Sequence, residues 1–139
     1  MTAARSFTIA PSLDELTRLA EAALGAMPEH LARHLEGVGI MVEERPDETT
    51  LAEMGLESPW DLTGLYRGTP LGSRSISDPV RMPDMIVLYR EPILLEWIET
   101  GVDLAALVRN VVVHEAAHHF GFSDAEIAAL EQEVKRALR

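Results

Sequence analysis

The residues best suited to chemistry lie close together near the C-terminal end of the chain. From His114 to His118 the sequence reads His-Glu-x-x-His. On an α-helix each residue advances by about 100°, so residues four apart lie within about 40° of each other and one turn apart. Two imidazoles at this spacing can bind one zinc ion, at about 2.0–2.1 Å each. Glu115 is rotated off the metal axis, so its carboxylate can serve as the base for a zinc-bound water.

A catalytic zinc ion needs a third protein ligand and an open fourth position. Asp124 follows His118 by six residues, with Gly121 between them. Glycine adopts the left-handed conformation at little cost, so Gly121 can end the helix and turn the chain back. The extended pattern is His-Glu-x-x-His-x-x-Gly-x-x-Asp. It predicts His114, His118 and Asp124 as metal ligands and Glu115 as the catalytic residue.

Each of these residues also has a purely structural interpretation. His114 and His118 could be ordinary histidines near a helix C-terminus, where the helix dipole favours positive charge. Glu115 could be a solvated glutamate, although it falls in an apolar stripe where an unpaired carboxylate is costly. Asp124 follows a serine that caps the next helix, a position where the dipole favours an acidic residue in any case. His119 projects about 100° away from His118, so we expect it at the surface or behind the ligands.

Secondary-structure signals place this motif on a helix. Asp103 is a typical N-cap, and an apolar helical pattern runs from there to Gly121. Ser-x-x-Glu capping boxes at Ser12 and Ser123 begin the first and last helices. The sequence predicts helices over about 13–24, 28–36, 92–100, 104–120 and 124–138, one helical turn near 50–54, strands at 38–43, 64–67 and 84–89, and a surface loop over 68–83.

Strands in the middle of the chain and helices at both ends indicate an α+β fold. A length of 139 residues fits one domain, 1–139, and 47% apolar residues exclude wholesale disorder. The absence of cysteine excludes a disulfide framework and thiolate metal ligands. A net charge of 12 − 23 = −11 argues against a nucleic-acid partner. We expect a cytoplasmic protein with no membrane partner, because neither a spanning segment nor a secretory signal is visible. The sequence leaves the oligomeric state open.

The chain resembles a family of small bacterial zincin-like metallopeptidases. The resemblance extends from about residue 38 to the end. It depends on Leu65-Tyr66-Arg67-Gly68-Thr69-Pro70-Leu71, on Pro83-Asp84-Met85-Ile86-Val87-Leu88-Tyr89-Arg90, and on the motif from His114 to Asp124. It implies a minimal zincin-like fold, with a small mixed sheet, helices and an active-site helix near the C-terminus. It also implies one zinc ion held by His114, His118 and Asp124, Glu115 as the base, and a peptidase-like role.

Two departures from larger zincins bear on activity. Only 15 residues follow Asp124, without a methionine, and the chain is too short for a second lobe around the substrate. Two functions therefore stay open beside a metal-free scaffold. The first is a zinc-dependent metallopeptidase acting on a peptide or protein substrate. The alternative is a catalytically weak or inactive metal-binding or interaction protein built on the same fold.

An enzyme of this kind would also need to align its substrate and stabilise the oxyanion. An extended peptide can pair with an exposed strand, and strand 84–89 is the expected edge. Tyr66, Tyr89 and His119 are the candidate oxyanion donors, among which the sequence does not choose.

Overall fold

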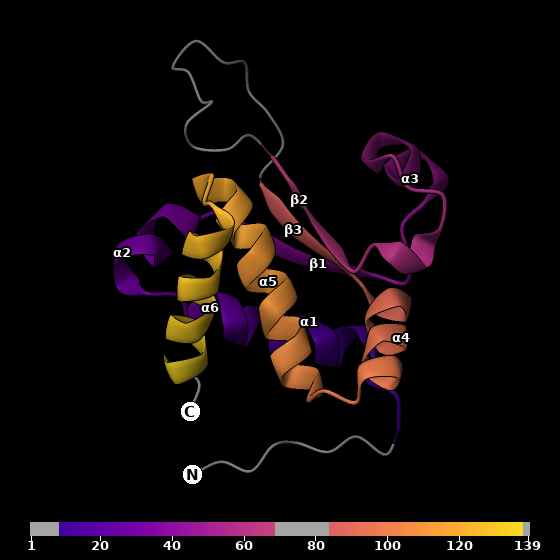
Figure 1. The fold of residues 1–139 in the computed structure, drawn as a ribbon, viewed down its shortest axis with the longest axis horizontal. Coiled ribbons are helices and arrows are strands. Elements are labelled where there is room, and N and C mark those ends of the chain that lie inside the picture. The colour runs from indigo at the N-terminus through magenta and orange to yellow at the C-terminus, as the bar shows by residue number, and fades with distance from the viewer. Residues whose placement is uncertain (1–8, 69–83, 138–139) are drawn as a thin grey trace.

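A computed structural model describes residues 9–68 and 84–137 of the chain (Figure 1). Helices make up most of this part and surround a small sheet. The helices are α1 (Leu13–Gly25), α2 (Glu29–Ala32), α3 (Glu48–Met54), α4 (Arg90–Thr100), α5 (Leu104–Phe120) and α6 (Asp124–Ala137), with 3-10 turns at Arg33–Leu35 and Pro59–Asp61. The strands are β1 (Gly39–Glu43), β2 (Gly64–Arg67) and β3 (Met85–Tyr89). The fold is α+β, as predicted.

The three strands form a mixed sheet in the order β1-β3-β2. β1 runs parallel to β3, and β2 runs antiparallel to it. The prediction that strand 84–89 forms an exposed edge is therefore wrong, because β3 pairs on both sides. Its residues from Ile86 to Tyr89 are at most 1% exposed, and an apolar run of this kind is typical of a strand covered on both faces.

The two faces of the sheet have different neighbours. Ile86 and Leu88 face the main core, which includes Leu16 of α1 and Val108 of α5. Side chains of alternate residues face the opposite side, where Val87 and Tyr89 pack with Leu62 and Leu65. Figure 1 shows α5 in the middle of the molecule, and it contacts α1, α6, α4 and both β2 and β3. The helix that carries the motif is thus the central element of the core.

The ends of α5 and α6 follow the predicted capping signals. The Asp103 carboxylate accepts a hydrogen bond from the backbone N–H of Ala106 at 3.0 Å. Gly121 ends α5 in the left-handed conformation, with φ of 68°. Ser123 and Glu126 then form the predicted capping box, with bonds of 3.3 and 3.0 Å. These local signals fix the register of the motif on its helix.

Three predicted helices differ clearly from the structure. The helix expected over 28–36 is divided into α2, at Glu29–Ala32, and the 3-10 turn at Arg33–Leu35. α4 begins at Arg90, two residues before Pro92, because proline is tolerated in the first turn of a helix. The single turn expected near 50–54 is longer, since Asp47 caps α3 by accepting a hydrogen bond from the N–H of Thr50 at 2.7 Å. The predicted loop lies, apart from Gly68, outside the described residues. No helix in the described ranges is long and apolar enough to cross a membrane.

Candidate active site

His114 and His118 lie side by side on one face of α5. Their ring centroids are 5.0 Å apart, and the ring planes are inclined by 68°. Both side chains are exposed, His118 by 50%. This is the arrangement that their spacing predicts, and it leaves both imidazoles accessible to an ion from solvent.

Glu115 lies directly behind this pair and is buried, at 8% exposed. The backbone N–H of Tyr66 in β2 donates a hydrogen bond to its carboxylate. Its Oε1 atom lies 3.1 Å from Nδ1 of His118. Burial raises the pKa of Glu115 to about 7, against the lowering effect of the Tyr66 N–H. The solvated-glutamate interpretation is therefore wrong, and the pKa suits a group that exchanges protons near neutral pH.

The close approach of β2 to α5 depends on Gly64. A Cβ atom on this residue would lie 2.7 Å from Cγ1 of Val111 and 3.0 Å from the carbonyl oxygen of Val87. It would also lie 3.8 Å from Cγ of Glu115. Only glycine fits without a shift, so Gly64 brings the strand that holds Glu115 against the motif helix.

We expect Gly64→Ala to lower the free energy of unfolding by about 1–3 kcal/mol, because the added methyl overpacks the contact between β2 and α5. Urea denaturation measures this loss. Val111→Ala removes the opposing methyl, so the double variant should lose less stability than the two single variants together. A Gly64→Ala protein as stable as the wild type would contradict this account of the contact.

Asp124 is the first residue of α6 and is exposed. It follows the Ser123 cap, so the helix-terminal interpretation fits its position. No hydrogen bond or ion pair holds its carboxylate within residues 9–68 and 84–137. In the same ranges, no three histidine, aspartate or glutamate side chains lie close enough together to hold a metal ion. The structure thus brings His114, His118 and Glu115 together but does not bring Asp124 to them.

His114 and Glu115 line a cleft of about 320 Å³. This volume is near the lower end of small-molecule sites, which span about 300–1,000 Å³. The other lining residues are Thr63, Glu96, Leu107, Asn110, Val111 and Glu131. Sequence reasoning missed Glu96 and Glu131, because they come from α4 and α6 and belong to no motif. The sequence did contain a signal for two other lining residues. Leu107 and Asn110 precede His114 by seven and four residues, which places them on the same face of the helix.

The family model for zincin-like metallopeptidases matches residues 35–134 of the chain. The chain belongs to the zincin-like metallopeptidase family. The match covers all three strands and the motif helix, so family membership confirms the resemblance and the expected fold class. At family level it supports a hydrolase of the metallopeptidase type and implies zinc. No curated protein matches the chain.

His119 of this zincin-like protein is buried, at 1% exposed, so of its two expected places the surface is wrong, and a place behind the histidine pair stays open. Its Nε2 atom donates a hydrogen bond to the carbonyl oxygen of His34 at 3.0 Å, since a carbonyl only accepts. Its Nδ1 atom shares a hydrogen bond of 2.5 Å with the hydroxyl of Tyr66. The Asp84 carboxylate lies 3.6 Å from the same nitrogen. A helical wheel gives the direction of a side chain, but not the strand and loop that enclose it.

Tyr66 connects this buried histidine to the candidate base. Its backbone N–H holds Glu115, and its hydroxyl binds His119, one turn further along α5. The three predicted oxyanion donors are therefore unequal. Tyr89 packs on the opposite face of the sheet from α5, with Leu62 and Leu65, so it cannot serve. Tyr66 and His119 are engaged with each other in the part of the zincin-like fold that the structure describes.

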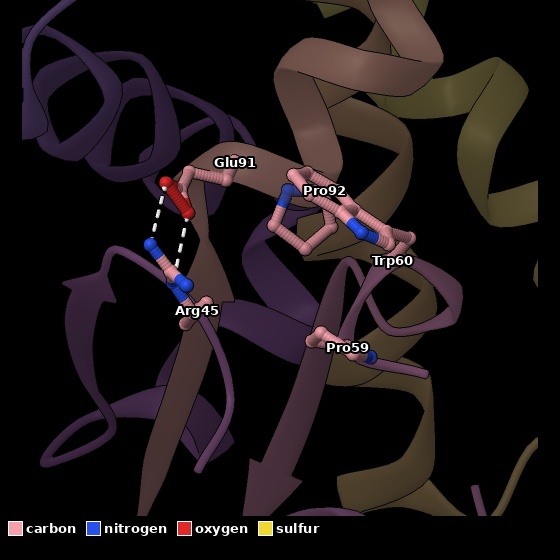
Figure 2. A pocket seen from close by; sticks show the side chains of 5 residues that line it. All are labelled: Arg45, Pro59, Trp60, Glu91 and Pro92. Atoms are coloured by element: carbon pink, nitrogen blue, oxygen red, sulfur yellow. Dashed lines mark hydrogen bonds and ion pairs between the residues drawn. The ribbon is translucent and has the colours of Figure 1, made fainter. Parts of the chain in front are cut away.

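Another cavity, smaller at about 70 Å³, lies away from the motif (Figure 2). Arg45, Pro59, Trp60, Glu91 and Pro92 line it. Figure 2 shows the Arg45 guanidinium turned toward the Glu91 carboxylate, and Nε lies 2.9 Å from Oε2. The positive charge of Arg45 and the negative charge of Glu91 therefore cancel. None of the residues that line this cavity belongs to the motif. The cleft along α5 is thus the better candidate for the zincin-like active site.

Proposed function

We propose that the protein is a zinc-dependent metallopeptidase that hydrolyses peptide bonds. In this proposal His114, His118 and Asp124 hold one zinc ion, and Glu115 is the general base. The observation that carries the proposal is a buried carboxylate placed behind an exposed imidazole pair, in the wall of a cleft. Burying a carboxylate is expensive even where a backbone N–H and a neighbouring imidazole contact it, as they do Glu115, and this cost favours a role for the residue.

The donor set suits zinc. Two adjacent neutral imidazoles and a carboxylate are common zinc ligands, and three of them leave a fourth position open. Asp124 is exposed and its carboxylate is uncommitted among the described residues, so its side chain can change rotamer. We propose that it completes the ligand set when the metal binds.

Zinc, when bound, supplies a Lewis acid that polarises the scissile carbonyl and makes water more acidic. The carboxylate of Glu115 takes a proton from the attacking water while the water oxygen bonds to the carbonyl carbon. Glu115 then gives this proton to the amide nitrogen as the C–N bond breaks, leaving a carboxyl and an amine. The Tyr66 N–H holds the base in place throughout. If the peptide pairs with an edge strand, β2 is favoured, because it contacts both β3 and α5.

We expect Asp124→Ala to weaken zinc binding by about 100-fold or more, because a catalytic site loses one of its three protein ligands. The free energy of unfolding should fall by less than about 1 kcal/mol, the usual scale of a helix-terminal charge. Competition with a chromogenic chelator measures the zinc affinity, and urea denaturation measures the free energy of unfolding.

Asp14→Ala is the control, since Asp14 is exposed and also lies in the first turn of its helix, two residues after the Ser12 cap of α1. It should keep the zinc affinity of the wild type. If Asp124→Ala also has the zinc affinity of the wild type, Asp124 is not a zinc ligand and only stabilises the N-terminus of α6.

One observation favours the second candidate function, a metal-binding or interaction protein without useful hydrolysis. In the described ranges, Asp124 is not gathered with the histidine pair. A protein of this kind would bind zinc through His114 and His118 and cleave nothing. Hydrolysis of a broad peptide library by the zinc-loaded chain separates the two functions.

A further inference from the structure

We propose that the cleft beside Glu115 takes a lysine or arginine side chain, so that the protein selects peptides with a cationic residue next to the scissile bond. The cleavage part of this inference rests on the proposed function, but the binding part does not. The cleft is lined by Glu96 from α4 and Glu131 from α6, helices that both pack against α5. Within residues 9–68 and 84–137, no lysine or arginine is among its lining residues.

No positively charged side chain in the described ranges pairs with Glu96 or Glu131, so their negative charge is not compensated there. Two other glutamates in the described ranges do have an arginine partner: Glu91 binds Arg45 at 2.9 Å, and Glu44 lies 3.2 Å from Arg90. Among the described residues, the carboxylates of Glu96 and Glu131 have no ion pair or hydrogen bond of this kind. A hollow lined by charge of one sign concentrates the opposite charge, so the cleft attracts cations.

Apolar residues in the cleft favour a cation that is attached to an aliphatic chain. Leu107 and Val111 line it and are buried, at 6% and 8% exposed. Lysine and arginine lay their methylene groups on apolar surface and keep the charged group among polar atoms. Glu96 is exposed and Glu131 is half-buried, so the cationic group would stay near solvent.

A free metal ion fits this part of the cleft less well. In residues 9–68 and 84–137, no three acidic or histidine side chains approach closely enough to ligate one ion. Carboxylates on separate helices can still contact different faces of one ammonium or guanidinium group, which carries several donors. Two carboxylates from separate helices, with no third ligand close to them among the described residues, therefore favour an organic cation on a peptide.

The test measures peptide binding with the full-length Glu115→Gln variant, so that cleavage does not interfere. Isothermal titration compares two peptides that differ at one position, lysine or the uncharged norleucine. We expect the lysine peptide to bind about tenfold more tightly, from two ion pairs of modest strength, and less so at high salt.

Glu96→Gln and Glu131→Gln, added together, should abolish this preference. Glu99→Gln and Glu133→Gln, on the same two helices but outside the cleft, should leave it intact. Glu96→Lys with Glu131→Lys should instead favour a glutamate peptide. Circular dichroism checks that each variant is folded.

Equal binding of the two peptides, binding of neither, or a preference that survives the Glu96 and Glu131 substitutions would overturn the inference. A lysine preference in a protein that cleaves no peptide would support the inference while the proposed function fails. Cleavage without any preference for a cationic residue would leave the proposed function standing and overturn the inference.

Discussion

Glu115→Gln should lower the rate of peptide hydrolysis by about 10²–10⁴-fold, the usual contribution of a general acid-base group. Glutamine has nearly the shape of glutamate, and its amide oxygen can still accept the hydrogen bond from the N–H of Tyr66. It cannot take a proton from water. The variant should therefore keep one zinc ion per chain, because Glu115 is not one of the proposed ligands. Cleavage of a fluorogenic peptide library and elemental analysis measure the two effects.

Glu133→Gln is the control for this experiment, because Glu133 is an exposed residue of α6 outside the cleft. It should cleave peptides at the wild-type rate. A Glu115→Gln protein that is as active as the wild type would exclude Glu115 as the base. A wild type that is inert across the library with zinc bound would instead support the metal-binding alternative.

His114→Ala should reduce the zinc content of the purified protein from about one ion per chain to almost none, since three ligands are the usual minimum for an open zinc site. His114 is exposed, so we expect the fold to survive its loss. The measurement is elemental analysis after reconstitution with zinc and dialysis, together with far-ultraviolet circular dichroism.

His30→Ala provides the comparison, because His30 is exposed on α2 and outside the motif. It should hold as much zinc as the wild type. If wild type, His30→Ala and His114→Ala are all equally empty after reconstitution, the chain has no zinc site of this kind.

Local signals in the sequence predicted most of the elements that position the site. The caps at Asp103 and Ser123 and the stop at Gly121 act within a few residues, so they can be read directly from the sequence. The spacing of His114 and His118 predicted their shared face for the same reason, since helix geometry alone fixes it. The family match over residues 35–134 agrees with the resemblance to which these residues pointed.

Features that depend on distant segments could not be predicted in this way. The central place of β3 follows from pairing with both β1 and β2, and no local pattern encodes these partners. His119 is buried because Tyr66 and the carbonyl of His34 meet it from far along the chain. Glu96 and Glu131 join the cleft through the packing of whole helices on α5.

For Asp124, the sequence motif and the structure point to different positions. The pattern His-Glu-x-x-His-x-x-Gly-x-x-Asp associates it with the two histidines, and the turn at Gly121 supplies a route between them. In the structure Asp124 lies at the start of α6, where the helix dipole also favours a carboxylate. Among the described residues it is not grouped with the two histidines. A bound cation would add the attraction that draws a carboxylate away from solvent.

Anomalous diffraction at the zinc edge, from crystals of the zinc-loaded chain, tests the central claim most directly. We expect one peak at about 2.0–2.2 Å from a nitrogen of His114, a nitrogen of His118 and a carboxylate oxygen of Asp124, with solvent in the fourth position. A peak elsewhere on the surface, or none at all, would contradict the metallopeptidase account. So would a zinc ion that four protein ligands enclose.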